Sequence, residues 1–352
     1  MLAGGCSLGN GPAFGGLSAG GAGGDEEGGS SGTDGGYDSS TGSHADEGST
    51  GGADEPDPEP DTDTDGDEPD DTTGTTGEED DGPLVECPPM VSTSTSGTIV
   101  DVSLPEVSGL AASRTAPGLL WAHNDSGDSA RVYVLGLDGA LLNTLGLPNV
   151  GHVDFEDIAV GPGPTPGRSY VYVGDIGDND ASRPFVTIHR FEENGDPAGY
   201  TGISSLETFD LYYPYHYPSS SHDAETLFVD PVDAAVYVVA EVAGRARLFR
   251  APNPLWSGGE LEDLGFLNTV DFIPTAGDIS PQGDFIVMRG PSEGGLWLRA
   301  PGQTVLNALQ HLPCELPIEA EGDGESITVL ADERSYVTTS EGIGQPIWHY
   351  EF

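Results

Sequence analysis

The chain has 352 residues, and its 60 acidic residues against 11 basic ones give a formal net charge of −49. All 11 basic residues are arginines. Nucleic-acid binding requires a basic surface that neutralises phosphates, so this composition excludes nucleic acid as a partner and favours divalent cations or basic proteins.

Residues 1–84 form a segment of their own composition. They hold 22 of the acidic residues, no Lys or Arg, and consist mostly of Gly, Ser, Thr, Asp, Glu and Pro. Such a segment cannot bury enough apolar surface to offset its ordering entropy, and its like charges repel one another. We therefore expect 1–84 to be a disordered acidic tether and 85–352 to be the folded domain.

The first residues, Leu2-Ala3-Gly4-Gly5-Cys6, resemble a bacterial lipobox, in which Cys6 would be lipidated. The apolar region of a signal peptide is missing, so either the signal is truncated or the match is a coincidence. No stretch of about 20 apolar residues could span a membrane. The sequence thus favours an exported bacterial protein, either a cell-envelope lipoprotein or secreted, that meets the membrane only through a lipid anchor.

Two further cysteines, Cys87 and Cys314, lie in the folded domain. In an exported protein they are expected to form a disulfide. The alternative is two separate buried thiols.

After residue 97, short runs of β-branched and aromatic residues alternate with Gly, Pro, Asn and Asp, which is typical of strands and turns. One two-strand unit recurs five times, with its key positions at residues 108, 156, 225, 278 and 325. Spacings of 47 to 69 residues between these positions predict an all-β fold, a β-propeller with five four-stranded blades. The longest unit leaves room for a sixth blade.

Second strands are expected to follow each first strand, for example at Leu119–Asn124 and Ser169–Asp175. The last unit has only three strands, which would leave an open sheet edge. We expect the N-terminal run Thr98–Leu104 to supply the fourth strand and to close the ring, which would also bring Cys87 near Cys314.

Acidic residues gather where the innermost strand of a blade begins and where the second strand ends, both of which lie at one mouth of the central channel. Carboxylate and amide oxygens suit Ca²⁺, so these positions predict a calcium site. The alternative for each is a turn-forming residue at a strand end. The candidate ligands are Asp125, Asp154, Glu156, Asp175, Asp178, Asp223, Glu225, Asp278, Glu325 and Glu341.

Three other residues are candidates for catalysis beside these acids. His123 and His222 could act as general acids or bases, although a histidine near a turn is more often a hydrogen-bonded residue. Arg289 is the lone cation in the set and could bind an anionic group.

Several segments together resemble bacterial secreted propellers related to phytase-like and esterase-like-activity-of-phytase domains: Trp121–Asp128, Asp154–Ala159, Gly174–Asn179, His222–Leu227 and Ala276–Gly283. The resemblance implies that Glu156, Glu225, Asp278 and Glu325 bind Ca²⁺ and that a metal-bound water hydrolyses phosphomonoesters. This chain departs from phytases in its five expected blades, in its lack of lysine and in offering only Arg289 for phosphate.

Our first hypothesis is a tethered or secreted calcium-binding propeller that serves as a binding or scaffold module, with an extracellular protein as its partner. The alternative is a Ca²⁺-dependent phosphoesterase of phytase-like type that acts on a small phosphorylated ligand. Whether the protein is an enzyme stays open at this point.

Overall fold

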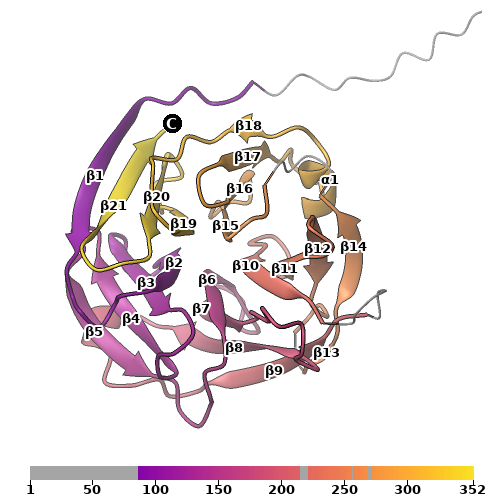
Figure 1. Ribbon diagram of the computed structural model, residues 1–352, viewed down its shortest axis with the longest axis horizontal. Coiled ribbons are helices and arrows are strands. Elements are labelled where there is room, and N and C mark those ends of the chain that lie inside the picture. The colour runs from indigo at the N-terminus through magenta and orange to yellow at the C-terminus, as the bar shows by residue number, and fades with distance from the viewer. Residues whose placement is uncertain (1–85, 215–220, 256, 268–271) are drawn as a thin grey trace, which may run out of the picture. The chain divides into compact units, whose positions relative to one another are not determined.

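Five antiparallel sheets surround a central axis as the blades of a β-propeller (Figure 1). The computed structural model describes residues 86–214, 221–255, 257–267 and 272–352. The expected tether, with Cys6, lies outside the described residues. The prediction of five blades, closed by an N-terminal strand, is confirmed.

The four main strands of each blade follow chain order from the channel outward, except in the last blade. Blade one holds β2 (Val107–Ala112), β3 (Leu119–Asn124), β4 (Arg131–Gly136) and β5 (Leu141–Gly146); blade two holds β6 (Phe155–Pro162), β7 (Ser169–Asp175), β8 (Val186–Glu193) and β9 (Glu207–Tyr212); blade three holds β10 (Asp223–Val229), β11 (Val236–Glu241), β12 (Ala246–Arg250) and β14 (Glu262–Phe266). Blade four holds β15 (Ala276–Ile279), β16 (Phe285–Arg289), β17 (Gly294–Leu298) and β18 (Cys314–Glu315); blade five holds β19 (Gly324–Val329), β20 (Ser335–Ser340), β21 (Gln345–Glu351) and β1 (Ser92–Ile99).

The hydrophobic core lies between neighbouring blades. Between blades two and three, for example, Tyr172 and Ile188 belong to the same buried cluster as Leu227 and Val238. The middle strands are buried on both faces, which explains their continuous Val, Ile, Tyr and Leu runs. Burial of such side chains is the main favourable contribution to the stability of the ring.

The closing strand differs from the prediction at Thr98–Leu104. Strand β1 ends at Ile99 and pairs antiparallel with β21, with Ser92 opposite Glu351. The Asp101 side chain then accepts hydrogen bonds from the backbone and hydroxyl of Ser103, at 2.9 and 2.6 Å, which turns the chain away from the sheet. The predicted disulfide is confirmed, because Cys87, just before β1, is bonded to Cys314 of blade four.

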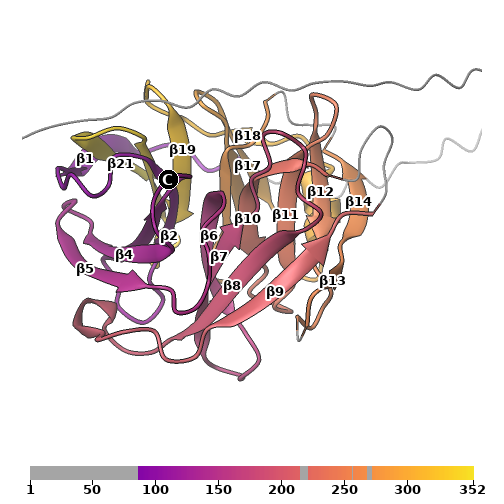
Figure 2. The same ribbon diagram turned by 60° about the horizontal axis from the view of Figure 1, so that its bottom comes forward.

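The long second unit holds no sixth blade within the described residues. Its extra length includes the connection between β8 and β9, with the 3₁₀ turn η1 (Pro197–Gly199), and residues 215–220, which are outside the described ranges. Blade two also receives a short fifth strand, β13 (Gly259–Glu260), from the connection between β12 and β14. Figure 2 shows β13 beside β9 at the periphery, where the two pair in parallel.

Two buried aspartates tie the innermost strands to one another. Asp157 of β6 accepts hydrogen bonds from the backbone amides of Leu227 in blade three, at 2.8 Å, and Gly277 in blade four, at 3.3 Å. Asp278 of β15 accepts one from the amide of Val329 in blade five, at 2.9 Å. Each carboxylate therefore links its blade to the next ones across the channel.

Two hydroxyl groups complete this ring of contacts. Thr328 of blade five donates to Asp278, at 2.8 Å, and accepts from the amide of Ala112 in blade one, at 2.9 Å. Ser108 of blade one donates to the carbonyl of Glu156 in blade two, at 2.7 Å. The set of Asp157, Asp278, Thr328 and Ser108, which we call the belt, thus joins all five blades inside the channel.

Among the described residues, the one α-helix, α1 (Val305–Leu309), has five residues, and no helix is long and apolar enough to cross a membrane.

Candidate functional site: an acidic channel mouth

Three glutamates at the mouth of the channel stand at β-bulges. Glu156, Glu225 and Glu325 are each the extra residue at a register shift between the innermost strand and the second strand of their blade. Ser108 occupies the same position in blade one. A bulge locally disrupts the ladder and re-aims a side chain, so these residues leave the alternation of their strands at the same level.

The carboxylates of blades one to three meet around Glu156. Oxygen atoms of Asp125, Asp154 and Glu156 lie within 4.8 Å of one another, and so do those of Glu156, Asp223 and Glu225. Ligand oxygens of one Ca²⁺ are each about 2.5 Å from the ion and so lie at most about 5 Å apart. Both groups satisfy that limit, and Glu156 belongs to both.

The bulge glutamates lie beside other acids. Oxygens of Glu156 and Glu225 are within 4.8 Å of each other, and the pKa of Glu325 responds to Glu341 at the end of blade five's second strand. Neighbouring carboxylates repel each other in their charged forms. We refer to the seven carboxylates Asp125, Asp154, Glu156, Asp223, Glu225, Glu325 and Glu341 as the acidic mouth.

Burial and mutual repulsion raise the proton affinity of the acidic mouth. Burial, followed by the negative charge of Asp125, raises the pKa of Asp154 to about 6. Burial and Glu341 raise the pKa of Glu325 to about 8. The pKa values of Glu156 and Glu225 are likewise raised, first by burial and then by nearby carboxylates. The protein itself does not compensate the negative charge of the ionised carboxylates. A bound cation would do so.

Asp125 and Gly177 shape the acidic mouth from the loops. The charge of Asp125, in the β3–β4 loop, raises the pKa of carboxyl groups in blades two, three and five, including Glu156, Glu225 and Glu325. A Cβ atom on Gly177 would lie 2.0 Å from Glu156 Oε1. A larger residue at position 177 would therefore displace these carboxylates from their present positions.

Asp175 and Asp178, also predicted as ligands, hold the rim of the acidic mouth. Asp175 forms an ion pair of 2.8 Å with Arg183 and accepts a hydrogen bond from the amide of Asp154, at 3.1 Å. Asp178 accepts from the amides of Ser182 and Arg183, at 2.8 and 2.9 Å. Both carboxylates therefore bind protein donors and orient the loops that carry the acidic mouth.

Asp278, another predicted ligand, lies in the belt. Its two oxygens accept hydrogen bonds from Ile279, Thr328 and Val329, and it is 5% exposed. Strand β15 pairs with β16 without the register shift of the other innermost strands. Without a bulge, the acidic residue of blade four follows the regular alternation and does not join the groups around Glu156.

The two candidate histidines are enclosed by other side chains. His123 is fully buried, its Nδ1 is 3.1 Å from the carbonyl of Asn124, and burial lowers its pKa to about 4. His222 packs on the rings of Tyr213 and Phe249, with centroids 5.0 and 6.0 Å away. Both rings pack as core aromatics, and a catalytic role for either stays a prediction.

Arg289 is wholly enclosed and its guanidinium is engaged. It forms an ion pair with the buried Glu321 and donates to the carbonyls of Gly290 and Pro291, both at 3.0 Å. A Cβ atom on Gly324 would lie 1.7 Å from its Nη2. The cation that was expected to face a phosphate therefore stabilises the junction of blades four and five.

No family model and no curated protein matches this sequence. Among solved structures, the fold is similar to the PQQ-bound form of an aldose sugar dehydrogenase from Streptomyces coelicolor, with 12% identity and a TM-score of 0.44. The match covers 75% of this chain and 99% of that chain. This similarity concerns the fold alone. The phytase-like relationship stays a prediction.

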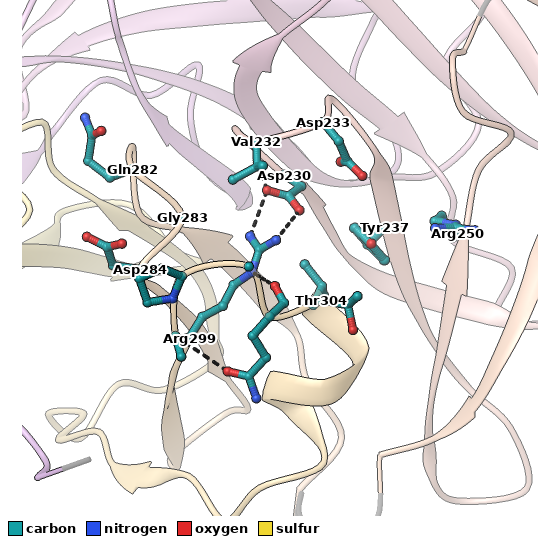
Figure 3. Close-up of a pocket in the computed structure, with 15 residues that line it drawn as sticks. Asp230, Val232, Asp233, Tyr237, Arg250, Gln282, Gly283, Asp284, Arg299 and Thr304 are labelled. Carbon is teal, nitrogen blue, oxygen red and sulfur yellow. Dashed lines mark hydrogen bonds and ion pairs between the residues drawn. The ribbon is translucent and has the colours of Figure 1, made fainter. Parts of the chain in front are cut away.

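A second hollow, which the sequence analysis missed, lies at the opposite ends of the strands, between blades three and four. Its volume is about 330 Å³. Figure 3 shows Arg299 paired with Asp230 within it, and both of these contacts measure 2.8 Å. Arg299 also donates to the carbonyl of Gln303, at 2.7 Å. Arg299 and Asp230 thus neutralise each other in this hollow, and the lining residues showed no shared spacing from which it could be found.

Proposed function

We propose that this protein is an exported β-propeller that binds divalent cations, Ca²⁺ in preference, at the acidic mouth and serves as a binding or scaffold module. The observation that carries the proposal is the position of Glu156, whose carboxylate belongs to both three-residue groups. A carboxylate with two oxygens can bridge two neighbouring cations, so two ions are the expected stoichiometry around it.

The donor set favours calcium among the common cations. Asp125, Asp154, Glu156, Asp223 and Glu225 offer carboxylate oxygens alone, without the sulfur or paired imidazole ligands that zinc or copper prefer. Blades two and three and the β3–β4 loop of blade one supply them, which suits an ion that accepts irregular coordination better than Mg²⁺ does.

Export is supported by the disulfide between Cys87 and Cys314, because stable disulfides form in oxidising compartments. Lipidation at Cys6 would then tether the domain to the cell envelope. The acidic mouth does not identify the partner of the module, which we expect to be an extracellular protein.

The phosphoesterase alternative is less well supported. A phosphate dianion needs positive charge beside the metal. Arg289 is enclosed by Glu321 and two carbonyls, and Arg183 is held by Asp175. We therefore favour binding over hydrolysis at this site.

Calorimetric titration of the chelator-treated full chain with CaCl₂ tests the proposal. We expect saturable binding of about two ions and a melting temperature that rises with Ca²⁺, as mass action requires. Glu156→Gln, which removes one charge and one oxygen ligand, should weaken binding by about tenfold or more, equivalent to one lost charge-assisted contact.

Asp284→Asn provides the matched control, because Asp284 is an exposed carboxylate at the opposite ends of the strands. Its calcium affinity should equal that of the wild type. Failure of the wild type to bind Ca²⁺, together with a melting temperature that EDTA leaves unchanged, would exclude the metal site. Ca²⁺-dependent release of p-nitrophenol from p-nitrophenyl phosphate, lost in Glu156→Gln, would instead establish the phosphoesterase.

A further inference from the structure

Two connections on the face of the acidic mouth carry exposed apolar side chains. Strands β1 and β20 both run toward this face, because β20 ends next to Glu341 and only β21, antiparallel to both, separates the two strands. Val100 and Val102, in the β1–β2 connection, are 68% and 75% exposed, and Ile343, in the β20–β21 turn, is 59% exposed. We call these three side chains the apolar ridge.

Hydrogen bonds hold the two connections against each other. The amide of Gly344 donates to the carbonyl of Ile99, at 2.9 Å, and the amide of Gly342 donates to the carbonyl of Pro105, at 2.7 Å. Ile343 therefore lies between two residues that contact the two ends of the β1–β2 connection, which brings the members of the apolar ridge together. Contiguous exposed apolar surface with a polar rim is typical of protein interaction sites.

The β1–β2 connection is anchored to blade one. The carbonyl of Ser103 accepts hydrogen bonds from the side chains of Asn124 and Tyr133, both at 2.8 Å. Leu104, the next residue, is fully buried. The fold thus holds Val102 in solvent while it buries an apolar residue two positions further on. A docking surface that is already in place loses little conformational entropy when a partner binds.

The surroundings of the apolar ridge are negative. Asp101 and Glu106 lie on the β1–β2 connection, Glu341 begins the β20–β21 turn, and neither connection contains Lys or Arg. Arg131, on the same face of blade one, is paired with Asp128 at 2.6 Å. A second copy of this acidic chain and an anionic lipid surface would both be repelled, whereas a basic partner would be attracted.

We propose that the apolar ridge and the carboxylates beside it form a docking surface for a protein segment that combines apolar with basic side chains. The apolar side chains of the partner pack on the ridge, and its Lys and Arg residues pair with Asp101 and Glu106. This inference rests on the proposed function, because it names the partner class of the binding module, but the contacts themselves require no metal at the acidic mouth.

Fluorescence anisotropy of the full chain with two labelled peptides tests the proposal in about 150 mM NaCl, where long-range attraction by the acidic chain is largely screened. One peptide is an amphipathic helix of leucine and lysine. In the other, serine replaces every leucine and the charge is unchanged. We expect the leucine–lysine peptide to bind tighter by about tenfold or more, because only this peptide buries apolar side chains on the ridge. A leucine–glutamate peptide should not bind.

The double variant Val102→Ser/Ile343→Ser removes most of the apolar ridge at exposed positions, where substitutions leave the fold intact. Its preference for the leucine–lysine peptide should fall to about threefold or less. The matched control, Val232→Ser/Leu312→Ser, changes side chains that are 69% and 86% exposed at the opposite ends of the strands, and it should keep the wild-type preference. Equal affinity of the wild type for the two lysine peptides, or an equal loss in the control, would overturn the proposal.

The docking surface and the metal site can fail separately. Calcium titration of Val102→Ser/Ile343→Ser should give the wild-type affinity, because the ridge offers no carboxylate. A wild type that binds Ca²⁺ but shows no peptide preference would contradict the docking surface alone. A wild type with the preference but without calcium binding would contradict the metal site alone. Phosphatidylcholine vesicles that bind the wild type but not Val102→Ser/Ile343→Ser would show that the ridge meets lipid, and this result would also overturn the proposal.

Discussion

Carboxylate oxygens of Glu156 and Glu225 lie within 4.8 Å of each other across the junction of blades two and three, although 69 positions separate the two residues in the chain. Burial and nearby carboxylates raise the pKa of both groups, so without metal the folded protein holds protons at its acidic mouth more tightly than the unfolded chain does. A cation that enters the mouth must displace them. The proposed binding of Ca²⁺ would therefore be accompanied by proton release.

This linkage predicts the pH dependence of stability without metal. The folded-state pKa values of Asp154, about 6, and Glu325, about 8, exceed the ordinary values of these carboxyls. The folded state then binds more protons than the unfolded state, and the free energy of unfolding falls as pH rises from about 4 to 8. Urea unfolding in EDTA at pH 5.5 and 8.0 should show the loss, and saturating CaCl₂ at pH 8.0 should restore it.

The double variant Glu156→Gln/Glu225→Gln serves as the control for general charge repulsion in this acidic domain. With two titrating groups removed, its stability in EDTA should decline less steeply with pH than that of the wild type. A wild-type protein that is more stable at pH 8.0 than at pH 5.5 in EDTA would contradict the raised pKa values.

The belt predicts a large cost for changing Asp157. Its Oδ2 accepts from two amides in two other blades, and an asparagine offers only one acceptor oxygen in place of two. Asp157→Asn should lower the free energy of unfolding by about 2–4 kcal/mol, the usual penalty for unpaired buried donors. The control Asp284→Asn should change the free energy of unfolding by less than about 0.5 kcal/mol. Denaturant unfolding of the two variants measures both effects. A loss below about 1 kcal/mol for Asp157→Asn would show that the belt is not critical.

The hairpin between β11 and β12 predicts a stabilising substitution. Ala243 and Gly244 both have positive φ, 54° and 73°, between the hydrogen-bonded residues Val242 and Arg245. This type I′ turn favours Asn at the first position. Ala243→Asn should raise the free energy of unfolding by about 0.5–1 kcal/mol, whereas Ala243→Val should lower it by about 1 kcal/mol or more. Equal stability of the two variants would be inconsistent with the turn.

The disulfide between Cys87 and Cys314 predicts a local and a global effect of its removal. Cys87→Ser/Cys314→Ser should lower the free energy of unfolding by about 2–5 kcal/mol, because a covalent loop of 227 residues is released. Hydrogen exchange should accelerate most in β1, which the bond holds beside β21. Cys6→Ser should leave both measurements unchanged, and undiminished protection of β1 in the double variant would contradict this role.

Much of the blade architecture could be predicted because the middle strands carry continuous β-branched and aromatic runs between turn residues. Leu119–Asn124 and Ser169–Asp175 were predicted with the bounds that β3 and β7 have. The closing strand was placed too late, since Val100, Val102 and Leu104 resemble a strand. The polar run Ser92–Ile99 forms it instead, because an outer strand needs backbone pairing more than apolar side chains.

The site was only partly predictable because bulges decide it. Glu156, Glu225 and Asp278 occupy similar places in their repeats, and a one-residue difference in pairing reverses which face a side chain occupies. The register shift is present in β6 and β10 but absent from β15. No residue type in the sequence indicates where it occurs. Asp157, beside Glu156, was overlooked for the same reason.

Ring closure by β1 has a consequence for how this protein acquires its structure. Ser92 finds its partner in Glu351, 259 positions further along, so blade five stays incomplete until almost the whole domain has been synthesised. Contacts this distant in sequence make folding slow. A chain that cannot close its ring early would stay extended for longer, which would suit the export proposed above, and the disulfide at Cys87 would then form after ring closure.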